Sequence, residues 1–151
     1  MVPTPQALAL AICDYVVVEE GRRNVSHIGS FTAIRPPHLP FVRPLCAYAV
    51  LTGGQEEASV ELTLTHMESD EEVYSLRSSV RLPDRLAEVR ILFRVSECDF
   101  PEAGSYLFTL LIDGDWVAHR RINVRPPETL SWTLRLSRIG PIPKRSPRTV
   151  C

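Results

Sequence analysis

Residues 100–124 read FPEAGSYLFTLLIDGDWVAHRRINV and carry the clearest fold signal in the chain. The first half alternates, so that Tyr106, Phe108 and Leu110 would share one face of an extended strand. The second half alternates less regularly, and the Asp-Gly pair at 113–114 between the two halves is typical of a tight hairpin turn. We therefore predict a β-hairpin that contributes to the core of a β-sandwich.

The register of this hairpin decides which side chains are buried, because a slip of one residue reverses both faces of a strand. A simple two-residue turn would pair Leu110 with Val117 and direct charged side chains toward the core. A three-residue loop, or a two-residue turn with a compensating bulge, pairs Leu110 with Ala118 instead and places Trp116 on the core face. In both solutions Arg120 is a misfit, which we expect at the end of the sheet or on a bulge.

Short apolar or alternating segments precede the hairpin, with Gly, Pro and acidic residues between them. With the hairpin they give about eight strands, a count that predicts an all-β fold. We expect a two-sheet antiparallel β-sandwich, either immunoglobulin-like or C2-like. The strands expected before the hairpin cover residues 7–20, 25–34 (with a bulge at Gly29), 45–51, 58–67, 74–82 and 89–95.

The chain has 151 residues, which is the size of one ordinary domain. We place the sandwich at 6–125 and a C-terminal extension at 126–151, with one edge strand over 130–136 and a basic disordered tail. All 18 acidic residues lie at or before Glu128, whereas five of the 17 basic residues follow it. The tail should therefore meet an anionic surface, either the body itself or another molecule. Its basic residues are Arg135, Arg138, Lys144, Arg145 and Arg148.

Three stretches resemble a known family: ALAICDYV at 9–16, IGSFTAIRPPHLPF at 28–41 and FPEAGSYLFTLLIDG at 100–114. Their order and spacing are similar to those of small uncharacterised bacterial proteins classed as a domain of unknown function, over residues 6–125. The resemblance implies a β-sandwich and supplies no activity, ligand or catalytic residue. Pro101, Gly104 and Tyr106 also resemble the tyrosine corner of immunoglobulin-like sandwiches.

Residues for catalysis or metal binding are scattered. There is no GxSxG motif, and each of the four histidines, at 27, 38, 66 and 119, stands alone in the sequence. Asp113 and Asp115 are the best metal candidates, although turn chemistry explains them without an ion. We therefore expect neither an enzyme nor a cofactor.

The cysteines indicate the compartment. Cys13, Cys46, Cys98 and Cys151 form no CxxC pair, and we see neither a secretory signal nor a membrane span. We expect a cytoplasmic protein with reduced thiols, with a Cys13–Cys46 disulfide as the alternative.

The most probable role, on these grounds, is a non-enzymatic accessory or protein-interaction module. Its partner would be a protein, met through a sheet edge or loops, with outward-facing Leu107 and Leu111 and the basic tail as interaction residues. The alternative is a small-ligand or calcium-binding sandwich that uses loops at one end. The acidic body argues against a nucleic-acid binder, and the oligomeric state stays open. A flat apolar patch at Leu107 and Leu111 would favour the first role, and a deep polar pocket the second.

Overall fold

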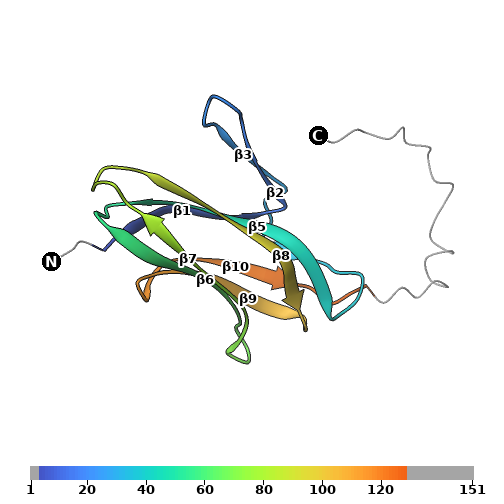
Figure 1. Cartoon of the computed structure of the whole chain (residues 1–151). Coiled ribbons are helices and arrows are strands. Elements are labelled where there is room, and N and C mark those ends of the chain that lie inside the picture. The colour runs from blue at the N-terminus through green and yellow to red at the C-terminus, as the bar shows by residue number, and fades with distance from the viewer. Residues whose placement is uncertain (1–3, 129–151) are drawn as a thin grey trace, which may run out of the picture.

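The structure is a computed structural model that describes residues 4–128. Two sheets lie face to face, a three-stranded sheet in the order β1-β5-β8 and a five-stranded sheet in the order β4-β10-β9-β6-β7 (Figure 1). A separate hairpin, β2–β3, projects away from both layers (Figure 1). The strands are β1 (Gln6–Cys13), β2 (Tyr15–Val18), β3 (Val25–Ile28), β4 (Ala33–Ile34), β5 (Phe41–Thr52), β6 (Glu57–His66), β7 (Glu71–Arg81), β8 (Val89–Phe100), β9 (Gly104–Ile112) and β10 (Asp115–Val124).

This architecture confirms the all-β sandwich that the alternating segments predict. The described part of the chain contains no helix at all, and so none that could cross a membrane. The immunoglobulin-like or C2-like subtype stays a prediction. The expected edge strand at 130–136 lies outside the described residues.

The core forms where the inward faces of the two sheets meet. In the five-stranded sheet, Leu62 pairs with Leu110 and Leu64 with Phe108, and all four side chains are fully buried. The three-stranded sheet contributes Leu45, Ala47, Ala49 and Leu51 from alternate positions of β5. Burial of this apolar surface is the main stabilising term, at roughly 25 cal/mol for each Å² removed from water.

The β9–β10 hairpin adopts one of the two predicted registers. Asp113 and Gly114 form a two-residue turn, with φ of 48° and 86°, as a type I′ turn requires. Val117 is an extra residue, so that Leu110 pairs with Ala118. The two-residue turn with a compensating bulge is therefore confirmed, and the three-residue loop is wrong.

The bulge also corrects one expected position. Trp116 precedes it and pairs with outward-facing Leu111, so the indole lies on the outer face and is 60% exposed. Beyond the bulge, Arg120 has the same parity as buried Ile122. Its Nε donates to the carbonyl of Leu10 in β1, 2.7 Å away. The expected misfit thus links the two sheets along one open side of the sandwich.

Two of the predicted strands are interrupted. Residues 7–20 break at Asp14, and the chain passes from β1 in the sheet to β2 in the projecting hairpin. Residues 25–34 break at Gly29, which has φ of 67° and ends β3 instead of forming a bulge within one strand. Each break divides one expected strand into two, which raises the count from about eight to ten. A third difference is that β5 begins earlier than expected and includes Pro44, which lies at a register shift, one of the places where a strand tolerates proline.

The tyrosine corner forms as its residues predict. The hydroxyl of Tyr106 donates to the carbonyl of Glu102 at 2.7 Å and accepts from the amide of the same residue at 3.2 Å. Tyr106 is fully buried and packs edge-on against Phe100, with ring centroids 5.3 Å apart. Burial raises the pKa of this phenol above its usual value. One side chain therefore fixes both the approach to β9 and the end of β8.

Replacing Tyr106 with Phe should lower the free energy of unfolding by about 1 to 3 kcal/mol, because both backbone partners at Glu102 lose their hydrogen bond. Urea unfolding measures the change. The exposed Tyr15 offers the matched control, and Tyr15→Phe should stay within about 0.5 kcal/mol of the natural chain. Equal effects of the two substitutions would contradict this account of the corner.

Candidate functional site

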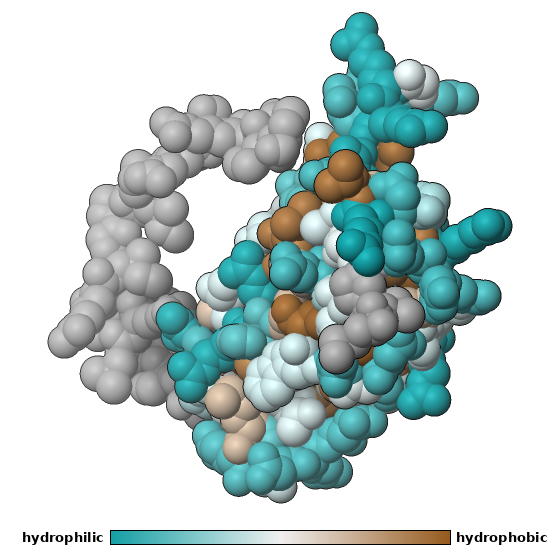
Figure 2. Space-filling model, turned by 90° about the vertical axis from the view of Figure 1, so that its left-hand side faces the viewer, coloured by the Kyte–Doolittle hydropathy of each residue, from teal (hydrophilic) through white to brown (hydrophobic). Residues whose placement is uncertain are grey.

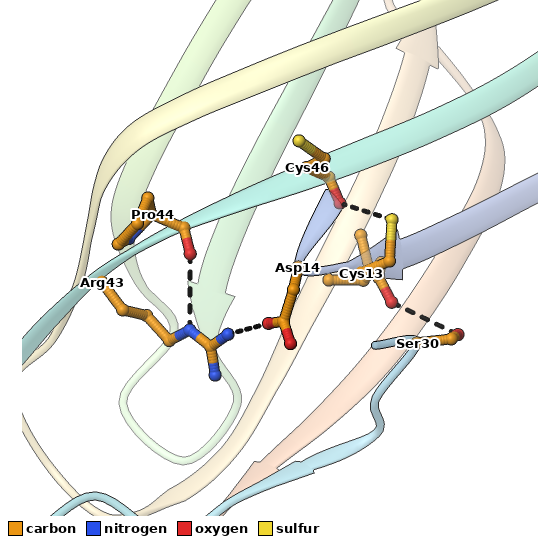
Figure 3. A network of polar contacts seen from close by, with 7 residues as sticks. Cys13, Asp14, Ser30, Arg43, Pro44 and Cys46 are labelled. Atoms are coloured by element: carbon orange, nitrogen blue, oxygen red, sulfur yellow. Dashed lines mark hydrogen bonds and ion pairs between the residues drawn. The ribbon is translucent and has the colours of Figure 1, made fainter. Parts of the chain in front are cut away.

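Polar contacts of Asp14 and Arg43 hold the base of the β2–β3 hairpin, and we call this pair the hinge (Figure 3). The amide of Asp14 donates to the carbonyl of Ile28, 3.0 Å away, and its carboxylate forms an ion pair with Arg43 of β5. The guanidinium of Arg43 also lies over the ring of Phe31, 4.6 Å from its centroid. Gly29 has φ of 67°, a conformation that favours glycine, and a Cβ there would displace the Asp14 carboxylate. These contacts fix the direction in which the hairpin leaves the sheet.

From this hinge the projecting hairpin stays in contact with the outer face of the three-stranded sheet at two points. The ring of His27 lies 4.6 Å from that of Tyr48, and Tyr48 is only 7% exposed although it points outward from β5. At the far end, Arg90 of β8 donates a hydrogen bond to the carbonyl of Arg23. An isolated two-stranded hairpin is marginally stable in water, so these attachments are what keep it ordered.

Two cavities lie between the hairpin and the sheet, and both touch Val16. The first has a volume of about 270 Å³, and its apolar lining includes Val18, Tyr48 and Leu92. The second has a volume of about 630 Å³ and extends along the sheet past Cys46 to Arg94 and Ser96. We call the two together the hairpin groove, defined by Val16, Tyr48, Leu92, Cys46, Arg90 and Arg94.

The opposite face of the hairpin is apolar and uncovered within the described chain. Tyr15, Val17 and Ile28 are 67%, 47% and 46% exposed, and Tyr15 and Ile28 are direct cross-strand neighbours. Tyr15 lies at the edge of this face and also borders the larger cavity of the groove. In the space-filling view, hydrophobic residues gather where the projecting hairpin meets the body, beneath a hydrophilic tip (Figure 2). Clustered apolar surface of this kind marks interaction sites more often than single exposed residues do.

The charge of the groove is opposite to that of the body. Four arginines line it, together with a single acidic residue, Asp14, for a net charge of +3. The body as a whole carries 12 basic and 18 acidic residues, a net charge of −6. Three of the groove arginines, Arg23, Arg90 and Arg94, form no ion pair with any residue in 4–128. The groove therefore presents unpaired positive charge beside apolar surface.

The interaction residues predicted from the sequence lie elsewhere. Leu107 and Leu111 are half-buried on the outer face of the five-stranded sheet, so their outward orientation agrees with the prediction. Their neighbours in the register are mostly polar: Thr65 and Arg121 flank Leu107, and Glu61 and Trp116 flank Leu111. The apolar surface there is therefore interspersed with polar groups. The predicted tail residues, Arg135, Arg138, Lys144, Arg145 and Arg148, lie outside the described residues.

One of the two metal candidates at the hairpin turn, Asp113, has a structural role. The Asp113 carboxylate accepts a hydrogen bond from the amide of Ser59 at 2.9 Å, and the Asp113 amide donates to the carbonyl of Ser59 at 2.8 Å. Asp113 and Asp115 both line a cavity of about 310 Å³, together with Glu56 and Glu57. Across residues 4–128, no three carboxylates, histidines or cysteines are grouped so that they could hold an ion. The turn contacts account for Asp113 without a metal.

We expect millimolar calcium to leave the melting temperature unchanged, because no ion-binding group forms around Asp113. Asp113→Ala should lower the free energy of unfolding by about 1 to 2 kcal/mol, with or without calcium, through loss of the bond to Ser59. Thermal melts of both chains, with and without the ion, measure this. A calcium-dependent rise in the melting temperature that Asp113→Ala abolishes would establish a metal site instead.

Each of the four histidines contacts a neighbouring residue in the described chain. His66 is buried at the end of β6, where its ring nitrogens contact Ser69 Oγ at 3.1 Å and the Ala103 carbonyl at 3.3 Å. His66 is thus a core residue at the end of its strand. His119 lies exposed on the outer face against Trp116. Neither histidine lines a cavity described above.

The first two cysteines are cross-strand neighbours in β1 and β5 (Figure 3). Both are free thiols, and the Cys13 thiol donates to the Cys46 carbonyl at 3.8 Å. Burial, helped by the neighbouring Cys46, raises the pKa of Cys13. Burial also raises the pKa of Cys98 to about 12. Cys46 alone of these three is half-buried, and it lines the larger cavity of the groove.

Iodoacetamide at about pH 8 should therefore modify Cys46 first, because Cys13 and Cys98 stay protonated and enclosed. Mass spectrometry of a Cys151→Ser chain measures the order of labelling, and adding Cys46→Ser should remove the rapid step. Equally rapid labelling of Cys98 in the folded chain would contradict the burial described here.

The sequence gives only an indirect signal of the hairpin groove. A run that is apolar on both faces, Tyr15–Val18, follows directly on β1, and the interrupting residue is Asp14. Read alone, that run predicts continuation of a buried strand. What turns it outward is the pairing of Asp14 with Arg43, which are 29 positions apart.

Comparisons with known proteins give a family and no activity. The model of a family described as a family of unknown function, DUF6941, matches residues 8–125. No curated protein matches the chain. Among solved structures, one that is similar is Pseudomonas fluorescens alkylpurine DNA glycosylase AlkC bound to DNA containing an abasic site analog, at 10% identity and a TM-score of 0.39. The match covers 77% of this chain and 30% of that one, and so weak a likeness supports no function.

Proposed function

This chain belongs to DUF6941, a family of unknown function, and we propose that it is a non-enzymatic β-sandwich module that binds a partner protein through the β2–β3 hairpin. The observation that carries this proposal is the pair of apolar surfaces on that hairpin. One face borders the hairpin groove, and the other exposes Tyr15, Val17 and Ile28.

The hairpin suits protein binding for a second reason. It projects from the sandwich and is fixed to the body at both ends, at its base through Asp14 and Arg43 and near its tip through Arg90. A pre-organised surface loses little conformational entropy when a partner binds. The hairpin thus offers exposed apolar area without the cost of ordering a free loop.

A non-enzymatic role is supported by what the polar groups do. In the described residues, the ring nitrogens of His66 contact Ser69 and Ala103, and a ring nitrogen of His38 contacts the Pro40 carbonyl. The carboxylate that lines the groove, that of Asp14, forms an ion pair with Arg43. General acid–base or nucleophilic catalysis needs such a group directed at a reacting atom in a pocket.

The proposal is tested by affinity capture from cells that express the natural gene. The variant Tyr15→Thr/Val17→Thr/Ile28→Thr removes apolar area and keeps residues that favour strands. We expect it to capture at least about tenfold less of a specific partner, because central apolar residues dominate binding energy. Quantitative mass spectrometry compares it with the unaltered full chain.

The matched control is Leu107→Thr/Leu111→Thr on the outer face of the five-stranded sheet, which should capture the partner normally. Thermal melts confirm that each variant folds. The proposal fails if no captured protein depends on the hairpin residues. If the control variant loses the partner instead, the binding surface lies on the five-stranded sheet.

A further inference from the structure

We infer that the hairpin groove binds an extended, acidic and apolar segment of the partner protein. This inference rests on the proposed function and deepens it, because it assigns a chemistry to the partner. The stripe Arg90, Leu92 and Arg94 along β8 carries it. These side chains share the outer face of the strand and lie two residues apart, so that positive, apolar and positive groups follow at a spacing of about 7 Å.

An extended segment has the same spacing on each of its own faces. A segment with the pattern acidic–x–apolar–x–acidic could therefore place its apolar side chain against Leu92 and its carboxylates beside Arg90 and Arg94. Val16 and Tyr48 form the rest of the apolar floor between the two arginines. The charge pattern thus determines the composition of the segment as well as its alignment.

The charges are available for a ligand. Arg94 is exposed and forms no hydrogen bond or ion pair inside residues 4–128. Arg23, at the other end of the groove, uses only its backbone carbonyl, as the acceptor for Arg90. Arg43, in contrast, is neutralised by Asp14. The net +3 of the groove therefore belongs mainly to Arg23, Arg90 and Arg94.

Two other occupants fit less well. The C-terminal tail of the chain carries five basic and no acidic residues, so the groove would repel it. A nucleic acid would match the arginines, but single strands bind through rows of aromatic platforms, and the floor of this groove is largely aliphatic. A protein segment is the occupant that matches both the charge and the floor.

The test uses the full chain and a displayed library of random peptides of roughly 12 residues as the probe. Selected sequences should be enriched in the acidic–x–apolar–x–acidic pattern. For a synthetic selected peptide, Arg23→Glu/Arg94→Glu should weaken binding at least about tenfold. Arg81→Glu/Arg121→Glu makes the same change of net charge on the five-stranded sheet and should change the dissociation constant less than about twofold.

Several results would overturn the inference: neutral or basic selected peptides, an absence of selected peptides, or equal binding by the two double variants. Stronger, Arg94-dependent binding of a single-stranded oligonucleotide of similar length would assign the groove to nucleic acid instead. A different result would contradict the proposed function, so the two proposals can be distinguished. If partner capture depends on Tyr15, Val17 and Ile28 but not on Arg23 and Arg94, the interaction module stands and the acidic segment is wrong.

Discussion

The ion pair between Asp14 and Arg43 determines where the apolar strand that begins the chain leaves the sandwich. Without a turn at this point, β1 would continue as a buried strand through Tyr15–Val18. The Asp14 amide instead bonds the carbonyl of Ile28 and closes a small hairpin, with Gly29 fitting against the carboxylate. A part-buried ion pair stabilises little by itself, but loss of one partner leaves the other poorly solvated. The hinge thus specifies a direction more than it adds stability.

That direction produces the surface on which the functional proposal depends. The hairpin covers Tyr48, leaves a groove above β5 and β8, and turns its second apolar face away from the body. The outer face of an antiparallel sheet is commonly open to water. Here it is covered in part, and arginines border the uncovered portion. On our proposal, this partly covered and positively charged face is where the partner binds.

Local patterns predicted most of the sandwich, because alternation in β6 and β9 directly reflects burial. They also predicted the tyrosine corner and the pairing of Leu110 with Ala118. The position of Trp116 was wrong because a bulge at Val117 reverses parity, and nothing in the local sequence marks which residue is extra. Arg120 illustrates the same limit, since its acceptor at Leu10 lies 110 residues away.

The candidate site was harder to predict than the fold. Leu107 and Leu111 face outward as expected, but polar neighbours from two other strands, β6 and β10, separate their apolar side chains. The alternation of apolar and polar residues does not predict the hairpin groove, because the groove depends on contacts between β2, β5 and β8 that form only after folding. Long-range pairs such as Asp14–Arg43 and Arg23–Arg90 create it, and a single sequence does not reveal which distant residues meet.

The most direct test of the central claim is amide hydrogen exchange of the full chain, with and without a bound partner segment. Binding at the hairpin groove should slow exchange in β2, β3 and the 90–94 stretch of β8. The β9–β10 turn and the outer strand β7 should exchange as they do in the free chain. Protection confined to the five-stranded sheet, with unchanged exchange in the hairpin, would contradict the account.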